Sequence, residues 1–157
     1  MAKTPIKLAS ARILISNDDG IGAPGIKRLE KIALGLGAEV WVVAPEHEQS
    51  GTGHSLTLRR PLRIRKIAAR RYAVDGTPTD CILLAVNQIM KGLKPDLVLS
   101  GINRGSNLGE DMTYSGTIAA AMEATLLGVP AIALSQRVPY EVLNSGGAAE
   151  WSAAETY

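Results

Sequence analysis

The chain has little cysteine, few aromatic residues and no long hydrophobic run. Cys81 is the single cysteine among 157 residues, so the chain can form neither an internal disulfide nor a cysteine-rich zinc site. Aromatic residues make up 4% of the sequence and phenylalanine is absent, so isoleucine, leucine, valine and alanine must build the core. No apolar run approaches the roughly 18 residues that a membrane-spanning helix needs. We therefore expect no membrane partner.

What is present is typical of one globular domain. Hydrophobic residues make up 46% of the chain and charged residues 20%, which are the proportions of a folded protein rather than a disordered one. Residues 1–10 contain two lysines but lack the apolar segment of a secretion signal. We predict a disordered leader over residues 1–10, a single domain over residues 11–157, and a location in the cytoplasm.

Basic residues are concentrated between positions 59 and 71. This stretch holds seven of the 17 lysines and arginines and no acid, although the net charge of the chain is only +2. Such a stretch can bind nucleic acid. However, its basic residues alternate with Leu62, Ile64 and Ile67, as in a solvated strand. We favour a solvated β-hairpin, with attraction of an anionic substrate as the alternative, and expect no nucleic-acid partner.

Strand-like and helix-like segments alternate along the chain. The pattern predicts strands at 12–16, 39–44, 96–100 and 130–134, helices at 26–36, 78–89 and 117–127, and antiparallel strands near 57–67 and 71–75. This alternation predicts an α/β fold, in which a mostly parallel sheet has helices on both faces and a small β-hairpin excursion near 57–75. The four main strands are continuous apolar runs, so we expect each to be covered on both faces.

The helix expected from position 78 has the most specific start signal. Thr77 can cap the helix, Pro78 suits the first helical position, and Asp80 follows Thr77 at the spacing of a capping box. The apolar face of this helix would consist of Ile82, Ala85, Val86 and Ile89.

Three polar loops follow the predicted strands, at 17–25, 45–55 and 101–115. In parallel sheets, ligands bind just beyond the carboxyl ends of the strands. These loops hold most of the unusual polar residues of the chain. The sequence therefore predicts the functional site at this edge of the sheet.

The first of these loops contains a literal dinucleotide-binding pattern, which we reject. Residues 20–25 read GIGAPG, and Glu46 lies 21 residues past Gly25, about where such folds place a ribose-binding acid. Asp18 and Asp19, however, directly precede the first glycine. Two carboxylates there would repel a pyrophosphate by several kcal/mol at about 4 Å, even with an effective dielectric constant near 20. We do not expect a nicotinamide dinucleotide.

The same two aspartates suit a hard cation. Both side chains can approach one ion only where the chain turns, and Gly20 and Gly22 permit a turn. Oxygen ligands favour Mg²⁺, Mn²⁺ or Ca²⁺ over zinc. The alternative is an ordinary turn in which one aspartate caps the following helix.

The other two loops carry further polar groups to the same edge. Residues 50–55 offer a hydroxyl and several backbone N–H groups, or form a flexible connector, and His54 is read as a hydrogen-bonded loop residue. Residues 100–107 bring amide oxygens and Arg104, which either contacts a phosphate or pairs with a carboxylate. Residues 114–117 open a helix whose free N–H groups favour an anion, although the serine there can be a plain N-cap.

These residues, in this order, resemble the SurE (survival protein E) family of divalent-metal-dependent 5′-nucleotidases, also described as acid phosphatases. The resemblance covers about residues 11–135 and rests on five ordered motifs. They are SNDDGIGAPGI at 16–26, VVAPEHEQSGTGHSLTL at 42–58, YAVDGTPTDC at 72–81, PDLVLSGINRGSNLGEDMTYSGT at 95–117, and AAAMEATLLGVPAIALS at 119–135.

The resemblance implies a Rossmann-like three-layer sandwich and one divalent cation per subunit, Mg²⁺ or Mn²⁺. The implied metal ligands are Asp18, Asp19, Ser50 and Asn103. It implies hydrolysis of nucleoside 5′-monophosphates to nucleoside and phosphate, with 3′-nucleotides and short polyphosphate as further substrates. It also implies a cytoplasmic homo-oligomer, either a dimer or a tetramer.

Our mechanistic hypothesis is metal-assisted phosphomonoester hydrolysis, in which a cation draws charge from the phosphoryl oxygens. Asp18 and Asp19 are the catalytic candidates, and the sequence leaves open whether one attacks phosphorus or acts as a base for water. Six residues would hold the non-bridging oxygens, partly through backbone N–H groups: Asn17, Gly51, Asn107, Ser115, Gly116 and Thr117.

The C-terminal region departs from the family pattern. Family members are considerably longer and have C-terminal arms, whereas Ser152 and Glu155 form a capping box that predicts a helix starting only just before the last residue. We therefore expect a chain truncated at its C-terminus. The alternative function is a metal- or nucleotide-binding domain without turnover.

Overall fold

The structure is a computed structural model that describes residues 5–37 and 39–137. Strands and helices alternate along the chain, as the sequence predicts. The elements are a 3₁₀ helix η1 (Leu8–Ser10), β1 (Arg12–Ser16), α1 (Pro24–Gly35), β2 (Glu39–Pro45), β3 (Ile64–Ala68), β4 (Arg71–Val74), α2 (Pro78–Leu84), a π-helical turn η2 (Ala85–Ile89), β5 (Leu97–Arg104), a 3₁₀ helix η3 (Gly109–Thr113), α3 (Gly116–Leu126) and β6 (Ala131–Gln136).

The described strands form a six-stranded sheet in the order β3-β4-β2-β1-β5-β6. All neighbouring pairs are parallel except β3 and β4, which form the antiparallel hairpin. From β1 the chain builds outward through β2 to the hairpin, and then crosses to β5 on the other side of β1. The order therefore reverses between β1 and β5, and ligands bind at such a switch point in open α/β sheets.

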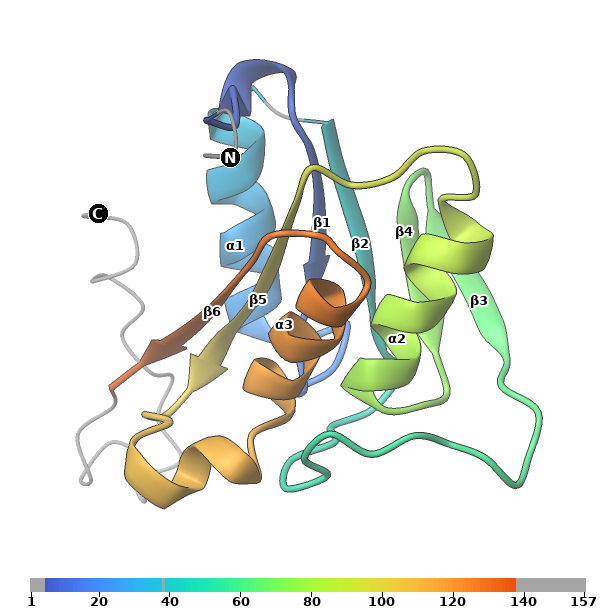
Figure 1. Cartoon of the computed structure of the whole chain (residues 1–157), viewed down its shortest axis with the longest axis vertical. Helices are drawn as coiled ribbons and strands as arrows, with labels where there is room; N and C mark the ends of the chain where they lie inside the picture. The colour runs from blue at the N-terminus through green and yellow to red at the C-terminus, as the bar shows by residue number, and fades with distance from the viewer. Residues whose placement is uncertain (1–4, 38, 138–157) are drawn as a thin grey trace.

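Helices cover both faces of the sheet. One core cluster packs α1 residues such as Ile26 and Leu29 against Ile13 and Ile15 of β1. A second cluster, on the opposite face, packs Ile82 of α2 and Ala120 of α3 against the sheet. In Figure 1, α2 and α3 lie in front of the sheet and α1 lies behind it. The predicted α/β three-layer sandwich is therefore confirmed.

The predicted start of α2 is confirmed in detail. Thr77 Oγ1 accepts a hydrogen bond from the Asp80 backbone N–H at 3.1 Å, and Asp80 Oδ2 accepts one from the Thr77 N–H at 2.9 Å. Pro78 occupies the first turn, where its missing N–H costs nothing. The reciprocal bonds fix the N-terminus of α2 at the edge of the sheet where the polar loops lie (Figure 1).

The prediction for the hairpin is too long on its first strand. β3 spans Ile64–Ala68 rather than 57–67, because side chains take the backbone donors that a longer strand would need. The Thr57 N–H donates to Asp80 Oδ1 at 3.1 Å, and the Arg63 N–H donates to Asp75 Oδ1 at 2.7 Å. Both acceptors come from other parts of the chain, so local alternation could not reveal them.

The basic stretch is largely neutralised within the chain. Five of its arginines form ion pairs with acids outside the stretch: Arg60 and Arg63 with Asp75, Arg65 with Glu46, Arg70 with Glu39 and Arg71 with Glu30. Most residues of β3 are exposed to solvent. The solvated hairpin that we favoured is therefore what the structure shows.

The predictions for β5 and β6 need correction, and those for the leader and for the C-terminal helix lie partly or wholly outside the described residues. β6 is not covered on both faces: it is the last strand of the order, and Ile132 remains 49% exposed in the described part of the chain. β5 continues to Arg104, beyond the predicted end at residue 100. Of the predicted leader, residues 8–10 form a 3₁₀ helix, and the helix predicted at residue 152 lies outside the described residues.

No helix within the described ranges is both long enough and apolar enough to cross a membrane.

Candidate metal and phosphate site

The three predicted loops meet at the carboxyl ends of β1, β2 and β5. The Gln49 N–H donates to the Asp18 carbonyl at 2.7 Å, which joins the loop after β2 to the loop after β1. The Gly53 N–H donates to the Tyr114 carbonyl at 3.1 Å, which joins the same loop to the entry of α3. These loops lie at the lower edge of Figure 1, next to the first turns of α2 and α3. The structure therefore brings the three polar loops together at one edge of the sheet, as the sequence predicts.

Asp18 is fixed and almost fully buried between β1 and α3. Its side chain is 4% exposed, and the Thr117 hydroxyl donates to Oδ1. Gly116 leaves the room for it, because a Cβ at that position would lie 2.7 Å from the Asp18 Cβ. Burial raises the pKa of the Asp18 carboxyl above its ordinary value, and the Thr117 bond opposes the rise only in part. The fold therefore holds a carboxylate where its charge is costly.

Asp19 adds a second carboxylate beside the first. Burial, followed by the neighbouring charge of Asp18, raises the pKa of Asp19 to about 6. A backbone hydrogen bond from Arg104 and the positive charge of that residue act in the opposite direction. The paired acids destabilise each other as anions, so a cation between them would relieve the repulsion.

Neutral oxygens complete a set of donors that suits a hard cation. Ser50 Oγ donates its proton to Glu48 Oε1 at 2.8 Å, so the Ser50 lone pairs remain available. Asn103 Nδ2 donates to the Gly105 carbonyl at 3.0 Å, which leaves the amide oxygen as the free acceptor. Within residues 5–37 and 39–137, no three His, Cys, Asp or Glu side chains form a metal-binding group. Two carboxylates with hydroxyl and amide oxygens fit Mg²⁺ or Mn²⁺ better than zinc.

The start of α3 offers an anion site next to these donors. Ser115 Oγ caps the helix by accepting the Ile118 N–H at 3.2 Å, and Gly116 and Thr117 form the first turn. The Thr117 N–H donates to the Asp18 carboxylate, so the Gly116 N–H and the helix dipole are what favour a phosphate there. Gly51 lies in an exposed stretch with no heavy atom within 4 Å of its potential Cβ position, so its backbone is open to a ligand.

Three side chains predicted to contact phosphate have other partners in the structure. Asn17 is fully buried, and its Nδ2 donates to the Gly20 carbonyl at 2.9 Å, so the side chain shapes the turn that presents Asp18. Asn107 Nδ2 donates to Ser135 Oγ at 2.6 Å, which joins the loop after β5 to β6. Thr117 likewise gives its hydroxyl proton to Asp18.

Several buried polar atoms at this edge have no hydrogen-bond partner. They include Ser16 Oγ, Asn17 Oδ1 and Ser100 Oγ. Ser16 and Ser100 face each other in the β1–β5 register, directly before the polar loops begin. An unpaired buried polar group costs roughly 1–3 kcal/mol. These unpaired groups therefore destabilise the unliganded fold at the edge where the ligands are expected.

The sequence did not identify Glu48 and Arg71 as members of this region. Glu48 accepts the Ser50 proton and raises the pKa of both aspartates, and its position two residues before Ser50 was the available signal. Arg71 Nη2 donates to the Ile21 carbonyl at 2.7 Å, which fixes the loop that follows the aspartates. No local pattern indicates this contact, which spans 50 residues of sequence.

Comparison with known proteins identifies the family of this chain. The family model described as survival protein SurE matches residues 13–156. The chain belongs to the SurE family.

SurE relatives match nearly all of this chain. It is 74% identical over 132 residues, or 84% of its length, to a protein named 5′-nucleotidase SurE from Paramagnetospirillum magneticum. It is 53% identical over 93% of its length to the protein of the same name from Caulobacter vibrioides. The chain covers 51% and 55% of these two relatives, so it spans about half the length of the curated relatives that it matches.

The SurE fold is also shown by a solved structure. The crystal structure of the SurE protein from Aquifex aeolicus matches with a TM-score of 0.76 and 51% sequence identity. The match covers 84% of this chain and 55% of that one.

Proposed function

We propose that this chain binds one divalent cation, Mg²⁺ or Mn²⁺, and hydrolyses nucleoside 5′-monophosphates to nucleoside and phosphate. The main support is the pair of aspartates held together at the switch point of the sheet. Asp18 contacts the N-terminus of α3, and the segments that carry Ser50 and Asn103 contact the aspartates through Gln49 and Arg104. Relatives at 53–74% identity bear the name 5′-nucleotidase SurE, which supports this substrate class.

In this proposal the metal ligands are Asp18, Asp19, Ser50 and Asn103. Thr117 and Gly116 fix the orientation of Asp18, one by a hydrogen bond and the other by close packing. A bound divalent cation would neutralise the charge of the phosphoryl oxygens and orient a water molecule. The backbone and side chains of the protein would bind the phosphate ester and orient it so that the attacking oxygen and the leaving oxygen lie on opposite sides of phosphorus.

The reaction requires an anion cradle and a place for one proton. Backbone N–H groups at Gly51 and Gly116 would hold the non-bridging oxygens of the phosphate, whereas the Thr117 N–H donates to the Asp18 carboxylate. In the water-mediated route, the water oxygen attacks phosphorus and gives one proton to Asp18 or Asp19 acting as a base. The bond from phosphorus to the ribose 5′-oxygen breaks, and that oxygen takes up a proton, so the nucleoside leaves as an alcohol. The fixed arrangement of Asp18 and Asp19 would reduce the reorganisation that the charged transition state requires.

The proposal includes 3′-nucleotides and short polyphosphate as further substrates, a cytoplasmic location, and a homo-oligomer of two or four chains. Apolar side chains exposed in this chain include Leu108 at 72% and Leu126 at 73%, and a second copy could cover them. The competing function is a domain that binds metal or nucleotide without turnover, because about half of the relatives' length is not represented here.

Phosphate release from AMP and GMP tests the proposal. We expect release with Mn²⁺ or Mg²⁺, loss of release with EDTA, and at least a 100-fold decrease in the Asp18→Asn variant, since outer-shell changes alone cost about 10–100-fold. Gly22→Ala serves as a matched loop control, because its added Cβ meets no heavy atom within 4 Å. Nucleotide binding without phosphate release would favour the non-catalytic alternative, and full activity of Asp18→Asn would refute the metal role of Asp18.

A further inference from the structure

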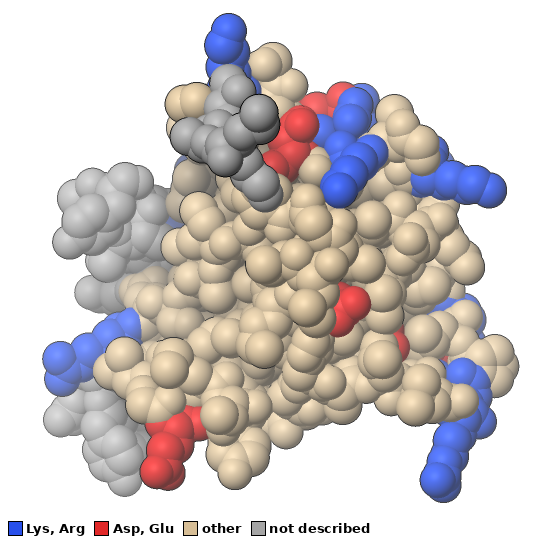
Figure 2. Space-filling view, in the orientation of Figure 1, with Lys and Arg blue, Asp and Glu red and all other residues tan. Residues whose placement is uncertain are grey.

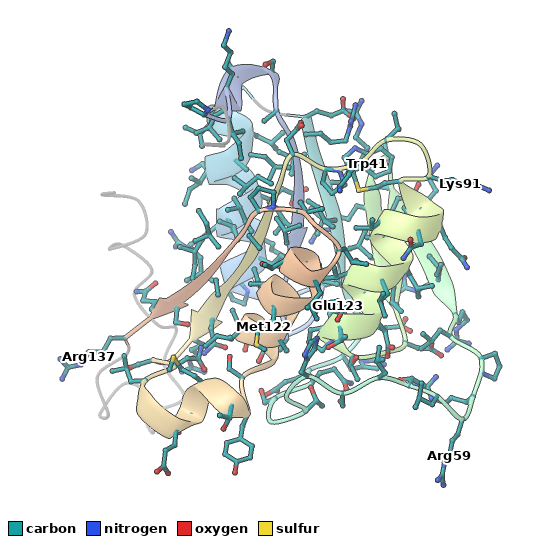
Figure 3. The ribbon with its side chains drawn as sticks, in the orientation of Figure 1. Trp41, Arg59, Lys91, Met122, Glu123 and Arg137 are labelled. Atoms are coloured by element: carbon teal, nitrogen blue, oxygen red, sulfur yellow. The ribbon has the colours of Figure 1, made fainter. Side chains whose placement is uncertain are left out.

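Helix α3 carries one charged side chain, Glu123, and the fold buries it. The helix is otherwise composed of glycine, threonine, methionine and aliphatic residues, and Glu123 is 9% exposed. Figure 2 shows a largely uncharged face with an acidic side chain near its centre, at the place where Figure 3 labels Glu123. A buried carboxylate is costly unless it is paired. The partner of Glu123 therefore matters to the structure around it.

That partner is His54, which comes from the loop between β2 and the hairpin. The two residues are 69 positions apart, and His54 Nε2 donates to Glu123 Oε2 at 2.8 Å. The His54 side chain is 31% exposed, whereas that of Glu123 is 12% exposed. The bond connects the loop that contains Ser50 and Gly51 to the middle of α3.

Glu123 lies on the same stripe of α3 that meets the aspartates. Gly116, Ala120 and Glu123 are spaced four and three residues apart, so they share one side of the helix. Gly116 packs against Asp18 at one end of this stripe, and Glu123 binds His54 about two turns further along. One helix face therefore contacts both the paired acids and the loop beside them.

The loop is fixed firmly on either side of Ser50 and Gly51 but weakly at those residues. The Gln49 N–H is bound to Asp18, and Gly53 packs against the backbone at Thr113, which its potential Cβ would approach to 3.2 Å. Ser50 and Gly51 are both exposed. Their positions relative to Asp18 therefore depend on how the flanking anchors hold the loop.

We propose that the His54–Glu123 bond is a positioning pair, which sets Ser50 and Gly51 against the first turn of α3 and so tunes metal and phosphate binding. This inference rests on the proposed function, because it assigns ligand roles to Ser50 and Gly51. Neither His54 nor Glu123 contacts substrate in this proposal. Partners that orient metal ligands typically contribute 10–100-fold to metal affinity or activity.

The test compares His54→Ala with His54→Gln in the 157-residue chain. Alanine removes the donor, whereas the glutamine amide can place a nitrogen donor near the position of Nε2. We expect His54→Ala to bind Mn²⁺ and inorganic phosphate about 10-fold more weakly and to lower kcat by a similar factor, with His54→Gln within about 3-fold of the wild type. Calorimetric titration gives the affinities, and phosphate release from AMP gives kcat and KM.

His47→Ala is the matched control. His47 is the other histidine of the chain, lies in the same loop, is exposed, and makes no side-chain hydrogen bond within the described residues. We expect it to bind Mn²⁺ like the wild type. Glu123→Gln is a second, milder variant, because its amide oxygen can still accept the His54 N–H. The Mn²⁺ affinity and the kcat of Glu123→Gln should lie between those of the wild type and those of His54→Ala.

The outcomes separate this inference from the proposed function. If His54→Ala melts at a lower temperature but keeps wild-type affinity and kcat, the pair is merely structural and the inference fails. If His54→Gln is as defective as His54→Ala, the hydrogen bond does not carry the effect and the inference fails as well. A wild-type chain that binds no Mn²⁺ and no phosphate would overturn the proposed function and the inference together.

Discussion

The pKa values of the acids in two regions of the molecule are shifted in opposite directions. At the hairpin side, a backbone N–H from Arg63, together with nearby arginines, holds the pKa of Asp75 below its ordinary value. A hydrogen bond from Trp41 and the charges of Arg12 and Arg70 do the same for Glu39. At the carboxyl edge of β1, burial raises the pKa of Asp18, and burial together with the charge of Asp18 raises the pKa of Asp19.

The difference indicates which region is built to receive a ligand. The hairpin acids have their counter-charges within the chain and gain nothing from an added cation. The paired aspartates lack a full counter-charge, and unpaired buried oxygens lie next to them. Sites that are unfavourable for the unliganded fold and are kept nevertheless are typical of function.

Gly116→Ala should have the largest effect of the variants considered, because it disrupts the packing of Asp18 against α3 and so lowers both stability and activity. The new Cβ would lie 2.7 Å from the Asp18 Cβ and 3.1 Å from Pro78 Cγ, so Asp18 or α3 must move. Overpacking of this kind costs typically about 1–3 kcal/mol, which exceeds the gain in helix propensity of up to about 1 kcal/mol. Urea unfolding and phosphate release measure the two losses. A stable, active Gly116→Ala variant would show that the close contact has no role.

Asp19→Asn should stabilise the chain in EDTA while abolishing its response to metal. The raised pKa means that the folded state binds the Asp19 proton more tightly than the unfolded chain does. The free energy of unfolding therefore falls as the pH rises from about 4 through about 6. At neutral pH we expect the variant to be more stable by about 1–2 kcal/mol, after discounting for partial exposure.

Thermal melts at pH 7.5, with EDTA and with Mn²⁺, compare the stability of Asp19→Asn with that of the wild type in the absence and presence of metal. The wild type should gain stability with Mn²⁺ according to its affinity, whereas Asp19→Asn should gain little. Equal melting temperatures of the two proteins in EDTA would show that Asp19 carries no electrostatic penalty.

Arg63→Ala should have the smallest effect, because it tests the neutralised region. Its guanidinium is 3.8 Å from Asp75 Oδ2 and the side chain is 74% exposed. Exposed ion pairs contribute about 0–1 kcal/mol, so unfolding by urea should change by less than about 1 kcal/mol, and Mn²⁺ affinity should not change. A clear loss of Mn²⁺ binding in this variant would link the two regions that we describe as separate.

Much of the site could be predicted from the sequence, because its main signals are local. Asp18 and Asp19 follow directly after an apolar strand, and the parallel-sheet rule places the three loops together. The Thr77–Asp80 capping box is likewise contained within four residues. Predictions of this kind need only the chain direction and the turn chemistry.

What the sequence could not reveal depends on contacts between distant segments. The Thr117 hydroxyl reaches Asp18 across 99 residues, and His54 reaches Glu123 across 69. The shortened β3 likewise results from Asp75 and Asp80 capturing backbone donors. No window of local hydrophobic periodicity contains such information.

Titration of the chain with Mn²⁺ tests the central claim most directly. Calorimetry at pH 7.5 should show one ion per wild-type chain, and binding at least about 100-fold weaker in Asp18→Asn. Equal Mn²⁺ affinity in the two proteins would contradict the assignment of the paired acids as the cation site.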